Sequence, residues 1–229
     1  PTITPEPELA RSARASLVKT LALREQYRDQ YWRRDLIAAD RLLWRAQSFR
    51  HLVHLLPGQS ILELGCGSGM FTGPLHWVSR GKNPITSVTF VPNAPRPATM
   101  PEDVEFIAAN ALPGALERSK FDFIVAMDLL DKRNCAWMLQ QVHDLLAPGG
   151  QVIFYESNPW NLFLKGRTAL SRFLGHKDPR ELLNRPELYE LMSELGFVRI
   201  FAVYNDFVYR MTRRVAWLFR NLSTLLENC

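Results

Sequence analysis

Three glycines at alternate positions follow a short apolar run, and this spacing is the strongest chemical signal in the sequence. Gly65, Gly67 and Gly69 come directly after Ser60–Leu64, a run that carries one acid, Glu63. Glycines spaced in this way allow a tight turn and let the backbone approach a ligand closely, because any Cβ would collide with it. A helix that begins after the turn directs free N–H groups and the positive end of its dipole toward that ligand. The segment therefore predicts a strand, a ligand-binding turn and a helix.

The composition of this turn argues against a dinucleotide as the ligand. The GxGxxG pattern of dehydrogenases needs a glycine at position 70, where this chain has Met70. A carboxylate at Glu63 would also repel a pyrophosphate, whereas it suits a ligand with a cationic amino-acid tail.

The turn lies near the start of an alternation of strands and helices. Short apolar runs typical of buried strands occur at Ser60–Leu64, Ile85–Val91, Val104–Ala108, Phe121–Met127, Gln151–Glu156 and Phe197–Val203. Stretches long enough for helices separate them, notably Met70–Ser79 and Ala136–Leu146, whereas three prolines between 93 and 102 leave no room for a long helix there. The pattern predicts an α/β fold with a Rossmann-like, doubly wound, mostly parallel sheet.

Other segments flank this core. Apolar residues recur at helical spacing from Leu9 to Leu56, which predicts two or three amphipathic helices that form an N-terminal helical cap. We expect a disordered linker at 1–8, the cap at 9–57, the core at 58–208 and a C-terminal amphipathic helix at 209–229. Residues 158–185 are expected to form an insertion beside the acceptor pocket.

In this order and spacing, the motifs resemble those of the class I S-adenosylmethionine-dependent methyltransferases, of the Rossmann-like, small-molecule type. ILELGCGSG is similar to the first motif of that family, FDFIVAMDLLD to its fourth strand and following turn, and LLAPGGQVIFYES to its fifth strand region. The matches span residues 60–203. The resemblance implies S-adenosylmethionine as the cofactor and methyl transfer as the activity.

The resemblance also implies a set of cofactor-binding residues. They are Glu63, Gly65, Cys66, Gly67, Gly69, Thr89, Phe90, Asn110, Ala111, Met127 and Tyr31, with Glu63 near the amino group of the cofactor. Two of them depart from the family. Thr89 stands where an acid usually holds the ribose hydroxyls, and Asn110 where an acid commonly holds the adenine amino group. These departures leave open a domain that binds the cofactor without transferring its methyl group.

The acceptor side is less specified, because an in-line methyl transfer gains much of its rate from alignment and can proceed without a general base. Candidate catalytic residues are His176, Tyr31 and Glu156, and candidate substrate-binding residues are Tyr27, Asn158 and Trp160. Tyr27 and Tyr31 are four residues apart, hence on one face of a helix. Cover by the cap, the insertion and the last helix favours a small-molecule acceptor in biosynthesis, with oxygen as the expected methylated atom.

The net charge of +5 is concentrated on the flanks of the chain. Residues 11–50 carry ten Lys and Arg against four acids, and residues 209–220 carry four Arg and no acid. A basic terminal helix can make peripheral contact with a membrane, so a lipid-associated methyltransferase stays open. A nucleic-acid methyltransferase is a further alternative, although the chain has no recognition module or target-base signature.

The remaining features predict a cytoplasmic protein without a bound metal. Cys66, Cys135 and Cys229 lie far apart and form no CxxC pair, so we expect free thiols. No stretch has the roughly 18 consecutive apolar residues of a membrane-spanning helix, and no signal pattern opens the chain. The linker-like start and the missing seventh strand suggest fusion to other domains.

Overall fold

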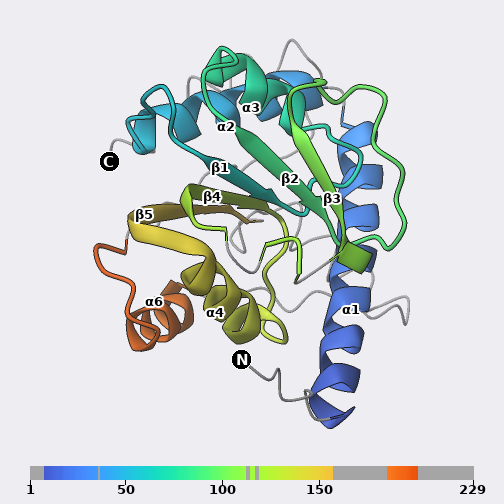
Figure 1. Ribbon diagram of the computed structural model, residues 1–229, viewed down its shortest axis with the longest axis vertical. Helices are drawn as coiled ribbons and strands as arrows, with labels where there is room; N and C mark the ends of the chain where they lie inside the picture. Colours follow the sequence, from blue (N-terminus) through green and yellow to red (C-terminus); the bar gives the residue numbers. More distant parts are fainter. Residues whose placement is uncertain (1–7, 36, 112–113, 117–118, 157–184, 201–229) are drawn as a thin grey trace, which may run out of the picture. The chain divides into compact units, whose positions relative to one another are not determined.

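A five-stranded parallel sheet forms the core of the structure (Figure 1), a computed structural model that describes residues 8–35, 37–111, 114–116, 119–156 and 185–200. Its strands are β1 Ile61–Leu64, β2 Ile85–Thr89, β3 Glu105–Ala108, β4 Phe121–Met127 and β5 Leu146–Tyr155. Their order is β3-β2-β1-β4-β5, and every neighbouring pair is parallel. The predicted Rossmann-like α/β fold is therefore confirmed. In such sheets ligands bind where the strand order reverses, at the carboxyl ends of the central strands.

The central strands of the sheet are almost completely buried. Every residue of β1 and β2 is buried, as are six of the seven residues of β4. The register pairs Leu64 of β1 with Val88 of β2 and with Ala126 of β4. The carboxyl ends of these three strands consequently lie at one edge of the sheet.

Two helices precede the sheet. They are α1 Glu8–Arg33 and α2 Ala38–Leu52, and α3 Thr72–Ser79 follows β1. Figure 1 shows α2 and α3 side by side, where the Arg50 guanidinium donates a hydrogen bond of 2.6 Å to the Val78 carbonyl. Phe49 of α2 packs edge-to-face on Phe123 of β4, with ring centroids 6.0 Å apart. The helix α1 crosses the carboxyl ends of the strands (Figure 1), and the contacts described below hold it there.

The chain forms two compact units. The first comprises Pro1–Trp32, Ala39–Leu129 and Leu145–Tyr155, and it contains the whole sheet. The second comprises Arg33–Ala38, Leu130–Asp144 and Glu156–Cys229, with α4 Cys135–Leu145 and α6 Arg185–Glu194. Within the second unit, Lys132 forms an ion pair of 2.7 Å with Glu187 of α6, and the His143 ring of α4 contacts Phe197.

The structure differs from the sequence predictions at two strands. β5 begins at Leu146 instead of Gln151, because Gly149 adopts a φ of +79° and an irregularity opposite Phe121 and Phe123 lets the chain join the sheet early. Residues 197–200 form no strand, although one was predicted over Phe197–Val203. The proline-rich stretch between 93 and 102 has no helix, as predicted.

Other predictions lie outside the described residues. These are the linker apart from Glu8, the insertion apart from Arg185, and the C-terminal helix at 209–229. Among the residues that the structure does describe, no helix is long and apolar enough to cross a membrane.

Candidate active site

The predicted strand, turn and helix are present at the carboxyl edge of the sheet. The turn leaves β1 at Leu64 and enters α3 at Thr72. Gly65 and Gly67 have φ values of +72° and +53°, a backbone conformation that residues with a Cβ rarely adopt. A Cβ at Gly65 would lie 2.6 Å from a methyl carbon of Leu129. The turn therefore needs glycine for its backbone conformation and for its packing.

Glu63 is held rigidly beside this turn. One of its carboxylate oxygens accepts hydrogen bonds of 2.7 Å from the hydroxyls of Thr72 and Ser87. Burial raises the pKa of Glu63, while the two hydroxyls and the nearby Arg28 oppose that rise. Burial also raises the pKa of the Cys66 thiol, which keeps it protonated and poorly nucleophilic.

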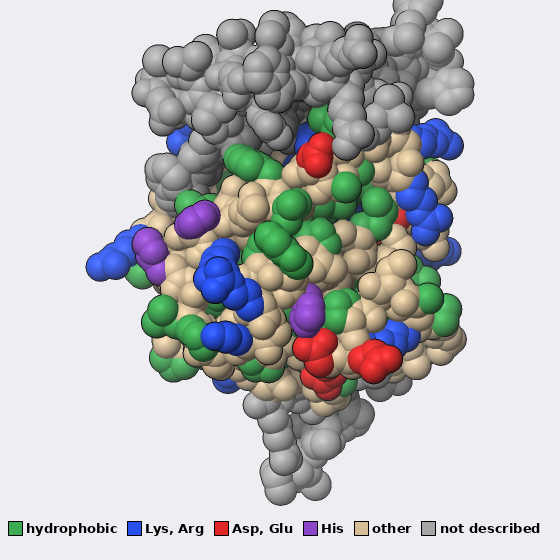
Figure 2. Space-filling view, turned by 90° about the horizontal axis from the view of Figure 1, so that it is seen from above, with side chains coloured by type: hydrophobic (Ala, Val, Ile, Leu, Met, Phe, Trp, Pro, Cys, Tyr) green, Lys and Arg blue, Asp and Glu red, His purple; other side chains and the backbone are tan. Residues whose placement is uncertain are grey.

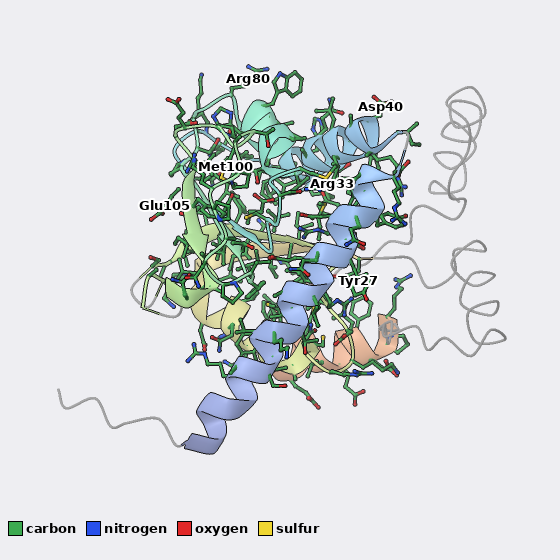
Figure 3. All side chains as sticks on the ribbon, turned by 90° about the vertical axis from the view of Figure 1, so that its right-hand side faces the viewer. Tyr27, Arg33, Asp40, Arg80, Met100 and Glu105 are labelled. Atoms are coloured by element: carbon green, nitrogen blue, oxygen red, sulfur yellow. The ribbon has the colours of Figure 1, made fainter. Side chains whose placement is uncertain are left out.

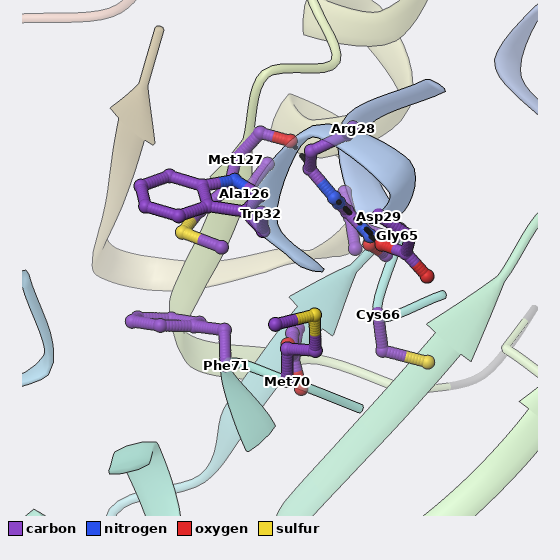
Figure 4. A pocket seen from close by; sticks show the side chains of 11 residues that line it. Arg28, Asp29, Trp32, Gly65, Cys66, Met70, Phe71, Ala126 and Met127 are labelled. Carbon is purple, nitrogen blue, oxygen red and sulfur yellow. Dashed lines mark hydrogen bonds and ion pairs between the residues drawn. The ribbon is translucent and has the colours of Figure 1, made fainter. Parts of the chain in front are cut away.

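Two charged side chains of α1 occupy the polar groups of the turn (Figure 4). The Arg28 guanidinium donates hydrogen bonds to the Gly65 carbonyl and, at 3.2 Å, to the Met127 carbonyl. It also forms an ion pair of 2.9 Å with Asp29, whose second oxygen accepts a hydrogen bond of 2.6 Å from the Ser68 N–H. Backbone groups of the glycine-rich turn are thus hydrogen-bonded to one positively and one negatively charged side chain of α1.

A third charged residue of α1, Glu25, reaches the end of β2. Its carboxylate accepts a hydrogen bond of 2.7 Å from the Thr89 hydroxyl and one of 3.0 Å from the Phe90 N–H. The side chain is completely buried, although it carries an ionisable group.

Glu25 should make the stability of the protein depend on pH. Burial raises its pKa from the ordinary 4.5 to about 7, against the opposing effects of Arg28 and the two hydrogen bonds. Between these values the folded chain holds a proton that the unfolded chain has released, so stability falls as pH rises through this window, by an amount on the order of 3 kcal/mol. Urea unfolding across the window should show the stability of wild type falling relative to that of Glu25→Gln. A difference in the free energy of unfolding that stays the same at every pH would contradict the raised pKa of Glu25.

A pocket lies between α1 and the strand ends. It is lined by Arg28, Asp29, Trp32, Glu63, Leu64, Gly65, Cys66, Met70, Phe71, Ala126 and Met127, and its atom-free volume, open solvent included, is about 280 Å³. The guanidinium carbons of Arg41 and Arg45 lie 5.1 and 4.8 Å from the centre of the Trp32 ring. Among the described residues, no group of three or more acids, histidines or cysteines could hold a metal ion.

The structure brings most of the predicted cofactor residues to this edge. Glu63, Gly65, Cys66 and Met127 line the pocket, and Gly67 and Gly69 belong to the same turn. Thr89 and Phe90 are in contact with Glu25. Asn110 and Ala111 lie in the short helix Ala109–Ala111 that follows β3, where the Asn110 side-chain oxygen accepts a hydrogen bond of 3.2 Å from the Asn93 N–H.

Two residues predicted for the acceptor side, Tyr27 and Tyr31, do not line this pocket. Tyr27 is 62% exposed (Figure 3), and Tyr31 is half-buried, with its ring edge-to-face against Trp32 at 5.6 Å; neither lines the pocket. Glu156 belongs to the second unit, where its carboxylate accepts a hydrogen bond of 2.8 Å from the Leu130 N–H. His176, Asn158 and Trp160 lie outside the described residues.

Sequence reasoning missed the inner face of α1. It singled out the tyrosines, whereas the residues that reach the strand ends are Glu25, Arg28, Asp29 and Trp32. A signal for them exists: Leu21, Glu25, Arg28 and Trp32 follow helical spacing, so two charged residues interrupt an otherwise apolar stripe. Charged residues on a buried helix face indicate a polar site, because burying an unpaired charge is costly.

A comparison with protein-family models matches residues 26–200 to the methyltransferase domain. The chain belongs to the methyltransferase domain family. Its cofactor is S-adenosylmethionine. No curated protein matches the sequence.

Solved structures of methyltransferases have the same fold. A putative methyltransferase from Bacillus halodurans has a TM-score of 0.50 and 13% identity, over 66% of this chain and 68% of its own. A putative O-methyltransferase from Nostoc punctiforme also has a TM-score of 0.50, with 16% identity over 71% of this chain and 51% of its own. A coclaurine N-methyltransferase is matched over 34% of its length, at 19% identity and a TM-score of 0.41, so this chain spans only part of several relatives.

The residues of this methyltransferase domain fit the cofactor. A Cβ on Gly67 would lie 2.6 Å from side-chain atoms of Arg28 and Asp29. The space beside this glycine is therefore filled only by the ends of two flexible side chains. The indole N–H of Trp32 and the hydroxyl of Ser68 are buried and have no hydrogen-bond partner among the described residues. Unpaired buried polar atoms are unfavourable, and a polar ligand in this pocket could satisfy them.

Proposed function

We propose that this protein transfers the methyl group of S-adenosylmethionine to a small-molecule acceptor, with oxygen as the expected methylated atom. The observation that carries the proposal is the glycine-rich turn at the carboxyl edge of the sheet, with a buried carboxylate on one side and α1 over it. Because α1 walls the pocket with Arg28, Asp29 and Trp32, a small acceptor fits this site better than a polymer.

The residues of the chain have distinct tasks in this proposal. When bound, the cofactor supplies an activated methyl group on a positively charged sulfur. The Glu63 carboxylate and the Gly65 carbonyl would hold its ammonium group, and Arg28, here paired with Asp29, would hold its carboxylate. Trp32 and Phe71 exclude water from the pocket, so the acceptor meets the methyl group in an apolar, ordered site.

A nucleic-acid acceptor receives less support from the surface. On the face that Figure 2 shows, the described Lys and Arg side chains stand among apolar and acidic ones and form no continuous basic patch. A protein that binds nucleic acid through phosphates usually presents such a patch.

One observation favours a second candidate function, a domain that binds the cofactor only as a regulator. Arg28 and Asp29 occupy the carbonyl and N–H groups of the turn, so the chain itself closes the site that the cofactor needs. In that case binding would open α1 and signal cofactor level without methyl transfer.

A methyl-transfer screen distinguishes these functions. Purified protein is first titrated calorimetrically with S-adenosylmethionine and S-adenosylhomocysteine, then incubated with methyl-labelled cofactor and phenols, alcohols, amines, anionic vesicles or RNA. A labelled small molecule, absent with the turn variant Gly67→Asp, supports the proposal. Label only in lipid or RNA overturns the small-molecule acceptor, and binding without any product favours the regulatory domain.

Removal of Asp29 should tighten cofactor binding. The Asp29→Ala substitution frees the Ser68 N–H and releases Arg28 from its ion pair, so the cofactor no longer has to displace a bound carboxylate. We expect S-adenosylhomocysteine to bind about three to ten times more tightly, the effect of one hydrogen bond. Asp40→Ala, on the exposed side of α2, is the control and should leave affinity unchanged. Weaker binding by Asp29→Ala would mean that Asp29 contacts the ligand directly.

A further inference from the structure

Glu25 is a buried carboxylate without an ion-pair partner among the described residues. It accepts one hydrogen bond from the Thr89 hydroxyl and one from the Phe90 N–H, and none of its side chain is exposed. A helix that only had to cover the sheet could use a leucine at this position, as it does at Leu21, one turn earlier. Burying a carboxylate costs free energy, so its presence calls for a function.

The position of this carboxylate matches a group that β2 lacks. In the family, an acid at the end of the second strand usually holds the ribose hydroxyls, and this chain has Thr89 there. In the structure, a carboxylate oxygen lies 2.7 Å from the Thr89 hydroxyl, but it comes from a residue 64 positions earlier. The short Thr89 side chain leaves space for Glu25, which an acid at position 89 would fill and repel.

The hydrogen-bonding capacity of Glu25 is only partly used. A carboxylate has about four acceptor sites, and the described residues occupy two of them. Two vicinal ribose hydroxyls are donors that could use the remaining sites, and a bond from a hydroxyl to an ionised acid is among the stronger hydrogen bonds.

We infer that Glu25 is the carboxylate that holds the ribose hydroxyls of S-adenosylmethionine, delivered by α1 instead of β2. The inference rests on the proposed function, because it concerns the same cofactor site. It makes α1 a part of the binding site, so cofactor binding stabilises the docked helix and an undocked helix binds the cofactor weakly.

The alternative is that Glu25 only fastens α1 to the sheet. Both roles predict weaker binding by Glu25→Gln, so affinity for one ligand does not separate them. If Glu25 only fastens α1, its substitution lowers the affinity for every ligand by the same factor. If Glu25 contacts the ribose, its substitution lowers the affinity only for ligands that carry the hydroxyls. The coupling between a protein change and a ligand change measures the contact itself.

The experiment is a calorimetric titration of wild type and Glu25→Gln, above pH 7, with S-adenosylhomocysteine and with its 2′-deoxy and 3′-deoxy forms. Wild type should bind at least one deoxy form about ten to a hundred times more weakly than the parent. Glu25→Gln should bind the parent more weakly by a similar factor and discriminate between the ligands less than about threefold. The control Glu105→Gln removes a carboxylate that accepts a hydrogen bond of 2.8 Å from Thr86, at the other end of β2, and should behave as wild type.

A second variant guards against loss of the fold. Glu25→Gln combined with Thr89→Asp restores a carboxylate from β2 and should recover the discrimination between parent and deoxy ligands. Full discrimination by Glu25→Gln, or none by wild type, overturns the role of Glu25 and leaves the proposed function standing. Failure of wild type to bind S-adenosylhomocysteine at all overturns both.

Discussion

The Gly67→Asp substitution should reduce the affinity for S-adenosylhomocysteine by about a hundredfold or more. Residue 67 has a φ of +53°, and a Cβ there would lie 2.6 Å from Arg28 and Asp29, in the space that the cofactor has to enter. The new carboxylate would stand beside Asp29 and would give Arg28 a second partner. It would thus fill the space over the turn and compete with the cofactor carboxylate for Arg28. Calorimetric titration of the purified variant measures the loss.

A matched control separates the effect of the substitution on cofactor binding from the effect of backbone strain on stability. Gly58 has a φ of +85°, and a Cβ there would meet no atom within 4 Å. Gly58→Asp therefore carries a similar backbone cost, about 1–2 kcal/mol, without touching the pocket. We expect both variants to melt a few degrees below wild type and only Gly67→Asp to lose binding. Binding by Gly67→Asp within threefold of wild type would place the cofactor elsewhere.

The Phe49→Ala substitution should have the largest effect on stability. Phe49 is completely buried between α2 and the sheet, edge-to-face on Phe123. Its truncation removes a large apolar contact and leaves a cavity, at a cost of about 3–5 kcal/mol. Domains have a free energy of unfolding of only about 5–15 kcal/mol, so the loss is a large fraction of the total. Urea unfolding of the variant measures it.

Leu52→Ala is the matched control for this prediction, because Leu52 belongs to the same helix and is 56% exposed. We expect its stability to lie within about 0.5 kcal/mol of wild type. Equal losses in both variants would mean that the packing of Phe49 on β4 does not account for the loss, because alanine itself favours the helix. Below its melting transition, Phe49→Ala should bind S-adenosylhomocysteine as wild type does, since Phe49 does not line the pocket.

The order of the elements followed from local patterns in the sequence. Short runs rich in apolar residues predicted β1, β2, β3 and β4 to within two residues at either end. Proline disrupts a helix, so the stretch before β3 was predicted to hold a short helix at most, and it has none. The boundary of β5 was missed because a strand through Pro148 and Gly149 depends on its neighbour β4, not on its own residues.

The turn of the site was also determined by the sequence alone. Gly65, Gly67 and Gly69 need only their own backbone geometry and the preceding strand, which are local properties. Thr89 and Asn110 could be recognised as departures for the same reason, because they are at fixed positions after β2 and β3.

Only the tertiary structure decided which side chains complete the site. Arg28 and Asp29 are 37 and 39 residues before the turn residues that they contact, and Glu25 is 64 residues before Thr89. No local rule states that α1 crosses the carboxyl ends of the strands. Helical periodicity places Leu21, Glu25, Arg28 and Trp32 on one face of α1, but it does not say what that face packs against. The sequence alone therefore shows that β2 lacks an acid at its end. Only the tertiary structure shows that a carboxylate lies there, because the packing of α1 on the sheet brings Glu25 to Thr89.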